Sequence, residues 1–384
     1  MTIRIEELID DRRVVICCGT GGVGKTTTAA VLALESARRG RNACVVTIDP
    51  ARRLADALGI EHLTNNPTEI DRDLWAHAGT NGNDPVPGGR LSAMMLDTKS
   101  TFDLLVARNA ASREQAKRIL ENTFYRNVSG ALGGTQEYMA MEKLHQLHDE
   151  GDFDLIVVDT PPTRHALDFL DAPKRLTRLL DNRVFRLLMM PTRAYLRVAS
   201  VAVQTFLRTV SRVVGSEVIE DVVAFFRAFE GMEEGFRMRA QVVDDLLTDP
   251  DTAFVLVCSP RRDAMEDATF FAKRLAEAGQ SVQALIVNRV HPSFGDEAPA
   301  GLRAAAEALR HAPAEAPRRL AALYDNLADF REIAALEREH IEALRARIGT
   351  DSALAYVPYL AHDVHDFATL HEVGQLLFDT VPAR

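Results

Sequence analysis

A glycine-rich stretch near the N-terminus constrains this chain more than any other feature. Residues 19–27 read GTGGVGKTT, which fits the pattern G-x-x-x-x-G-K-T. A short apolar run precedes the stretch at 14–18, and helical sequence follows it at 25–39. This strand–loop–helix context is what makes the pattern specific. It predicts a phosphate-binding loop in which backbone N–H groups and a helix N-terminus face an anion.

The residues of this loop have expected roles. Lys25 is expected to neutralise the β- and γ-phosphates of a nucleotide, and the Thr26 hydroxyl to hold Mg²⁺. The alternative is a glycine-rich turn that binds nothing, but a lysine buried there would be costly without an anion. The predicted nucleotide-binding positions of the loop are Gly21, Gly22, Val23, Gly24, Lys25, Thr26 and Thr27.

Two carboxylates end apolar runs that we expect to lie beside the loop. Asp159 ends the run at 154–159. A carboxylate at the carboxyl end of a parallel strand faces the ligand crevice, where it can hold Mg²⁺ or its waters. Asp49 follows the run at 43–48 and is predicted to position or deprotonate the attacking water. A helix cap before Pro50 is the alternative for Asp49, and the two roles can coexist.

The order of elements predicts an α/β fold, with a doubly wound, mainly parallel sheet. Residues 61–90 are rich in Asn, Pro, Gly and Asp and predict a long loop. The helical stretch at 165–248 is too long for a simple crossover. We therefore expect a single P-loop ATPase domain over residues 1–384 with helical insertions at about 100–149 and 165–248. Further strands are expected at 91–97, 253–258, 282–288 and 353–358, and further helical sequence at 262–278 and 300–347.

Composition excludes several classes of protein. The net charge is −10, from 45 basic and 55 acidic residues, which argues against nucleic acid as the main partner. The four cysteines lie in apolar runs and form no C-x-x-C pair, so neither a disulfide framework nor a cysteine zinc site is expected. The chain shows no apolar signal core and no apolar run of membrane-spanning length, which predicts a cytoplasmic protein.

Five segments together resemble a known family, the ArsA-type ATPases. They are GTGGVGKTT, TIDPARRLADA, QEYMAMEKL, VVDTPPTRHALDFL and LIVNRV, at residues 19–27, 47–57, 136–144, 157–170 and 285–290. The family includes arsenite-efflux ATPases and ATPases that target tail-anchored membrane proteins, and it is related to the dimerising MinD and ParA proteins. The motifs fall in family order, and the resemblance spans about residues 14–365.

The resemblance implies a reaction and a set of partners. It implies hydrolysis of ATP to ADP and phosphate with Mg²⁺, which drives a switch in a dimer that handles a protein or membrane-associated client. It also implies that Asn288 reads adenine, and that the loop starting at Pro358 packs on the base. Segments after Asp49 and Asp159 correspond to loops that sense the γ-phosphate.

The departures from the family pattern bear on this prediction. Thr20 stands where the family has a signature lysine that reaches the partner's nucleotide. The protein is therefore expected either to form a heterodimer with a lysine-bearing paralogue, or to be a slow or non-hydrolysing nucleotide-binding regulator. The cysteines cannot converge on the helical region, so arsenite binding is not expected, and zinc-mediated dimerisation is not expected without C-x-x-C. A ParA- or MinD-like positioning role would need a membrane-targeting helix, for which the C-terminal VGQLLFDTVPAR is too short and too weakly basic.

The second helical insertion carries two apolar stripes, at 196–214 and 218–247. Either the two helices bury their stripes on each other and on the sheet, or they form a groove for an apolar helix of a client. Residues 174–212 hold nine basic residues against one acid. This local excess predicts contact with an anionic membrane surface, peripheral to the bilayer, or with an acidic partner; the alternative is a solvated face.

Overall fold

A buried, mainly parallel sheet organises the chain in the computed structural model, which describes residues 4–49, 53–79, 88–128, 135–161, 168–181, 216–349 and 351–378. The eight strands follow the order β3-β4-β2-β5-β1-β6-β7-β8. All neighbours pair in parallel except β3, which runs antiparallel to β4. The strands are β1 (Val14–Cys18), β2 (Asn42–Thr47), β3 (Thr68–Glu69), β4 (Arg90–Met95), β5 (Leu155–Asp159), β6 (Thr252–Cys258), β7 (Val282–Val290) and β8 (Ala353–Pro358). The predicted α/β class is confirmed.

The central strands are continuous apolar runs because helices cover both faces of the sheet. In β1, Val15 and Cys17 face one core, and Val14, Ile16 and Cys18 face the other. The first core contains α1 (Ile5–Asp10), α2 (Lys25–Arg38), α3 (Arg53–Leu58) and α18 (Phe367–Phe378). The second contains α8 (Thr135–Glu150), α14 (Glu233–Thr248), α15 (Arg262–Glu277) and α17 (Glu315–Ile348). All four cysteines are buried in these strands and unbridged, as expected.

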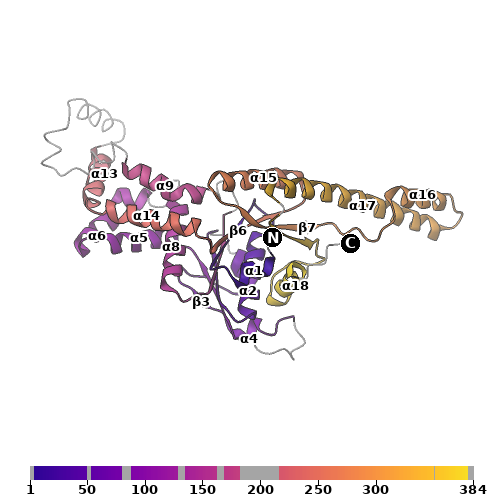
Figure 1. Ribbon diagram of the computed structural model, residues 1–384, viewed down its shortest axis with the longest axis horizontal. Helices are drawn as coiled ribbons and strands as arrows, with labels where there is room; N and C mark the ends of the chain where they lie inside the picture. The colour runs from indigo at the N-terminus through magenta and orange to yellow at the C-terminus, as the bar shows by residue number, and fades with distance from the viewer. Residues whose placement is uncertain are drawn as a thin grey trace.

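A helical lobe lies at one end of the sheet (Figure 1). Its own apolar core joins the ends of α8 and α14 to α5 (Thr98–Asn109), α6 (Arg113–Leu120), α7 (Thr123–Val128), α9 (Asp168–Asp181) and α13 (Ser216–Ala228). Within the predicted stripe at 218–247, Phe229, Met232 and Phe236 are buried in this core. The stripe is divided between α13 and α14. The stripe predicted at 196–214, and the basic stretch beyond residue 181, lie outside the described residues.

A helical hairpin projects from the opposite end (Figure 1). It consists of α16 (Pro299–Arg310) and α17, so the helical sequence expected at 300–347 is two helices. None of the helices in the described ranges is long and apolar enough to cross a membrane.

The segment 61–90, expected to be a long loop, contains regular structure. It includes strand β3 and helix α4 (Arg72–Trp75). Asp71 caps α4 by accepting a hydrogen bond from the Asp73 N–H at 3.0 Å. The Trp75 ring is buried, and its N–H donates to the Ile70 carbonyl. The burial of Trp75 therefore anchors a short helix within a segment whose composition is typical of loops.

Candidate functional site

The glycine-rich loop connects β1 to α2, as its sequence context predicts. Gly24 precedes α2 with φ 97°, a conformation that favours glycine. A Cβ on Gly24 would lie 2.2 Å from the Asn288 side-chain nitrogen, and one on Gly19 would lie 2.1 Å from the Val257 carbonyl oxygen. The loop is therefore pressed against the ends of β6 and β7: a side chain at position 19 would clash with backbone, and one at position 24 would have to displace the Asn288 amide.

Lys25 is buried at the start of α2, with a relative exposure of 5%. Its ammonium group donates a hydrogen bond to the Thr20 carbonyl oxygen at 2.7 Å. Burial lowers the pKa of Lys25, and the nearby Asp159 carboxylate opposes that shift. Within the described part of the chain Lys25 forms no ion pair. An anion above the loop would supply the missing counter-charge.

Asp159 ends β5 between the ends of two neighbouring strands, in register with Cys17 of β1 and Thr47 of β2. One carboxylate oxygen, Oδ2, accepts hydrogen bonds from the hydroxyls of Thr26 at 2.8 Å and Thr47 at 2.9 Å. The other, Oδ1, is buried without a hydrogen-bond partner in the described residues. Burial raises the pKa of Asp159, against the two hydroxyl donors and Lys25.

These groups fit a divalent cation. An unpartnered carboxylate oxygen and an adjacent hydroxyl are the oxygen ligands that Mg²⁺ prefers. The buried Oδ1 of Asp159 and the hydroxyl of Thr26 would be the protein's contribution, directly or through water.

Asp49 lies where β2 ends, largely buried, and its backbone N–H donates to the Thr47 hydroxyl at 3.2 Å. Its carboxylate is 3.7 Å from the Arg53 guanidinium. Asp49 lines a cavity of about 360 Å³ with Gly22, Gly24, Lys25, Thr26 and Thr27. The structure thus brings the predicted phosphate ligands and the predicted water-positioning carboxylate to one cavity. Residues 50–52 lie outside the described part, so the helix-cap alternative for Asp49 stays a prediction.

A second cavity, of about 320 Å³, is lined by the residues expected to contact the base, and we call it the base cavity. Asn288 and Pro358, from the ends of β7 and β8, line it together with Gly24 and Thr27. The Asn288 amide donates to the Val23 carbonyl oxygen at 2.8 Å, which fixes the end of β7 to the loop. A cavity of this size with one amide and several apolar walls suits a small ligand.

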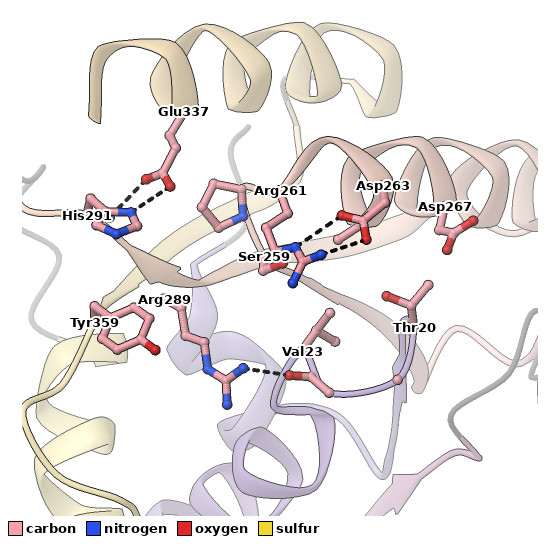
Figure 2. A pocket seen from close by; sticks show the side chains of 14 residues that line it. Thr20, Val23, Ser259, Arg261, Asp263, Asp267, Arg289, His291, Glu337 and Tyr359 are labelled. Atoms are coloured by element: carbon pink, nitrogen blue, oxygen red, sulfur yellow. Dashed lines mark hydrogen bonds and ion pairs between the residues drawn. The ribbon is translucent and has the colours of Figure 1, made fainter. Parts of the chain in front are cut away.

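A third cavity, of about 540 Å³, also borders the loop (Figure 2). Gly21 and Val23, predicted as nucleotide ligands, line this third cavity. They do not line the cavity of about 360 Å³ around Lys25, which we call the phosphate cavity after its predicted ligand. The Thr20 side chain also borders it. Arg261 and Asp263 pair on its wall, and His291 contacts Glu337 from α17 (Figure 2).

Three residues in and around the phosphate cavity escaped the sequence reasoning. Thr47 holds Asp159, Arg53 approaches Asp49, and Arg289 lines all three cavities. Thr47 is itself a polar residue at the end of an apolar strand, and Arg289 follows the polar Asn288 near the end of another, so polar residues at strand ends are the signal that could have found them. Arg53 stands one turn after Asp49 and carried no such signal.

The comparisons with known proteins agree with this geometry. The profile of the ArsA ATPase family, described as anion-transporting ATPases, matches residues 12–308. The chain is 24% identical over 296 residues to "ATPase GET3" of Malassezia globosa, covering 76% of this chain and 78% of the relative. It is 24% identical over 295 residues to "ATPase ASNA1 homolog" of Dictyostelium discoideum, covering 74% and 75%. It is 30% identical over 168 residues to "ATPase asna-1" of Caenorhabditis elegans, covering 42% and 45%. With a family match over most of its length and the glycine-rich loop between β1 and α2, the chain belongs to the ArsA family of ATPases.

Proposed function

We propose that the protein hydrolyses ATP to ADP and phosphate with Mg²⁺ at the cavity around Lys25. The observation that carries this proposal is the pair of incompletely partnered charges: Lys25 without an ion pair in the described residues, and Asp159 with one unpartnered oxygen. Both charges are costly to bury unless a ligand completes them. A nucleotide phosphate beside a divalent cation completes both.

The residues divide the work of the reaction. Lys25 would neutralise the β- and γ-phosphates, while Thr26 and Asp159 would hold Mg²⁺. Bound Mg²⁺ supplies charge neutralisation at the phosphate oxygens. Asp49 would orient the attacking water and accept its proton, because it lines the same cavity as Lys25. Asn288 and Pro358 would fix the adenine in the adjoining cavity.

Hydrolysis would drive a change in a dimer, which would handle a protein or membrane-associated client. The helical lobe supports this role, because α8 and α14 contribute to both the sheet core and the lobe core. A change at the end of β5 can therefore be passed through packed helices to the lobe. The client would contact the lobe, at an apolar or basic surface.

Steady-state ATP hydrolysis by the purified protein tests the proposal. Lys25→Ala serves as the blank, and chelation of Mg²⁺ should lower the rate to that blank. Lys273→Ala is the matched control, since Lys273 is an exposed lysine of α15 that only approaches Glu277. A rate in Lys25→Ala equal to the wild-type rate would refute the assignment.

Thr20 favours a second candidate function. Its side chain carries no charge toward the third cavity, so the chain cannot deliver a cation from position 20. The protein would then be a slow or non-hydrolysing regulator, or one subunit of a heterodimer with a lysine-bearing paralogue. Tight ATP binding with a turnover no higher than that of Lys25→Ala would support this candidate. Co-purification from the native host would then separate the regulator from the heterodimer subunit.

A further inference from the structure

Arg289 has an unusual backbone conformation at the end of β7. Its φ is 63°, in the left-handed region that residues other than glycine seldom adopt. The pairing register of β7 with β8 shifts between Asn288 and Val290, so Arg289 is left out of the ladder. Irregularities of this kind re-aim a side chain and are frequent next to active sites. Here the irregularity turns Arg289 toward the glycine-rich loop (Figure 2).

The Arg289 side chain sits at the junction of the three cavities. Among the described residues, Arg289 alone lines the phosphate cavity, the base cavity and the third cavity. One guanidinium nitrogen, Nη1, donates to the Gly22 carbonyl oxygen at 3.0 Å. A nucleotide with its base beside Asn288 and its terminal phosphate above Lys25 would pass directly by this guanidinium.

Its hydrogen-bonding capacity is largely unused. A guanidinium has five N–H donors, and in the described part of the chain Arg289 makes one hydrogen bond and no ion pair. Two neighbouring arginines differ in this respect, because Arg53 approaches Asp49 and Arg261 pairs with Asp263. The planar fork of an arginine matches phosphate oxygens, and such contacts are about twice as strong as neutral hydrogen bonds.

We propose that Arg289 is a nucleotide-contacting residue that binds the phosphate chain between the base and the terminal phosphate. The guanidinium would exchange the Gly22 carbonyl for phosphate oxygens when a nucleotide enters. The ligand class is therefore nucleoside diphosphates and triphosphates, which Arg289 selects over the bare nucleoside. This inference rests on the proposed function, because it assumes a nucleotide on the glycine-rich loop.

Calorimetric titration with ATP, ADP and adenosine, in the presence of Mg²⁺, tests the role of Arg289. The informative variant is Arg289→Asn, because asparagine tolerates a positive φ and lacks the charge. We expect it to weaken ATP and ADP binding by about tenfold to a hundredfold, and to leave adenosine binding unchanged. Arg289→Lys should retain part of the affinity. Arg261→Asn is the matched control, since that guanidinium lines the third cavity and is held by Asp263.

The outcomes separate this inference from the proposed function. Unchanged ADP affinity in Arg289→Asn, or an equal loss for ADP and adenosine, would overturn the role of Arg289. Wild-type protein that binds neither ATP nor ADP would overturn the proposed function, and the role of Arg289 with it. Loss of ATP binding in Lys25→Ala upholds nucleotide binding at the glycine-rich loop, independently of the result for Arg289. Thermal unfolding checks the fold of Arg289→Asn, and Arg289→Gln replaces it should that variant be unstable.

Discussion

The site contains two buried ionisable groups, and burial shifts the pKa of each in the direction that favours its uncharged form. Burial lowers the pKa of Lys25 and raises that of Asp159. A raised carboxyl pKa means that the folded chain binds this proton more tightly than the unfolded chain does. Ionised Asp159 therefore opposes folding at pH 7, and this cost disappears as pH falls through the raised pKa. Such local instability is typical of sites that a ligand completes.

Asp159→Asn should consequently abolish ATP hydrolysis without lowering the free energy of unfolding. We expect it to abolish Mg²⁺-dependent ATP hydrolysis, because Asp159 supplies the buried oxygen for the metal. We also expect the nucleotide-free variant to be at least as stable as the wild type at pH 7, since an amide can still accept from Thr26 and Thr47. Chemical denaturation at pH 7 and at acidic pH measures this, and any advantage of the variant should shrink as pH falls. A large loss of stability at pH 7 would contradict the argument.

Gly24 permits a second prediction at the residue scale. Its φ of 97° and the Asn288 amide beside it leave no room for a methyl group. Gly24→Ala should therefore displace Asn288 from the Val23 carbonyl and weaken the binding of both ATP and adenosine. It should also destabilise the fold by more than about 1 kcal/mol. Gly279→Ala is the control, because Gly279 also has a positive φ but has open space around it.

Glu337 of helix α17 is linked through His291 to Tyr359 of the base cavity. Glu337 accepts hydrogen bonds from the His291 backbone N–H at 2.9 Å and from its ring at 2.7 Å. The His291 ring stacks on Tyr359 at a centroid distance of 5.8 Å, and Tyr359 lines the base cavity. The projecting hairpin and the nucleotide site therefore share a structural unit.

Glu337→Ala should loosen this unit. It removes two hydrogen bonds of the half-buried His291, each worth about 0.5–1.5 kcal/mol, so we expect a loss of about 1–3 kcal/mol in the free energy of unfolding. Affinity for adenosine should also fall, because Tyr359 loses its fixed neighbour. Urea denaturation and calorimetry measure the two effects. Glu332→Ala is the control: it removes an exposed pair with Arg303 and should cost less than about 1 kcal/mol. Equal losses in the two variants would contradict the special role of Glu337.

At the scale of elements, the sequence predicts the strands and motifs that a local residue pattern determines, and not the features that depend on packing between distant segments. The apolar runs at 14–18 and 253–258 locate β1 and β6, since a strand buried on both faces needs such a run. The glycine-rich loop and Asp159 follow from motif and strand position. The role of Arg289 does not, because its direction depends on the register of β7 against β8. Helix α4 was missed because the packing of Trp75, not propensity, holds it.

In the whole molecule the sheet lies between the helical lobe and the projecting hairpin (Figure 1), and the three cavities lie near the carboxyl ends of its strands β1 and β7. The sheet joins the two ends, and the third cavity beside Thr20 borders both the loop and α17 through Glu337. A change in the glycine-rich loop can thus be passed both to the helical lobe and to the projecting hairpin. Position 20 lies at this junction, and its side chain carries no charge.

Thr20→Lys tests whether the proposed dimer needs a cation from position 20 for hydrolysis. A cation delivered in trans to a transferring phosphate is worth roughly 10³–10⁵ in rate. In a homodimer each new lysine would face the partner's nucleotide, so we expect turnover to rise about tenfold or more, and to depend on protein concentration. Thr20→Met, similar in length and uncharged, should leave turnover unchanged.

The same variant distinguishes the remaining possibilities. In a heterodimer with a lysine-bearing paralogue, Thr20→Lys alone should stay slow, and addition of the paralogue should raise the rate of the wild-type chain. If the lysine at position 20 and Arg289 act on different nucleotides, combining Thr20→Lys with Arg289→Asn should give the sum of the separate changes in activation free energy. Fast turnover by a wild-type homodimer that Thr20→Lys fails to raise would exclude both the slow switch and the heterodimer. The cation would then have to come from another residue of this chain. A strongly non-additive effect of combining Thr20→Lys with Arg289→Asn would identify Arg289 as the source of that cation.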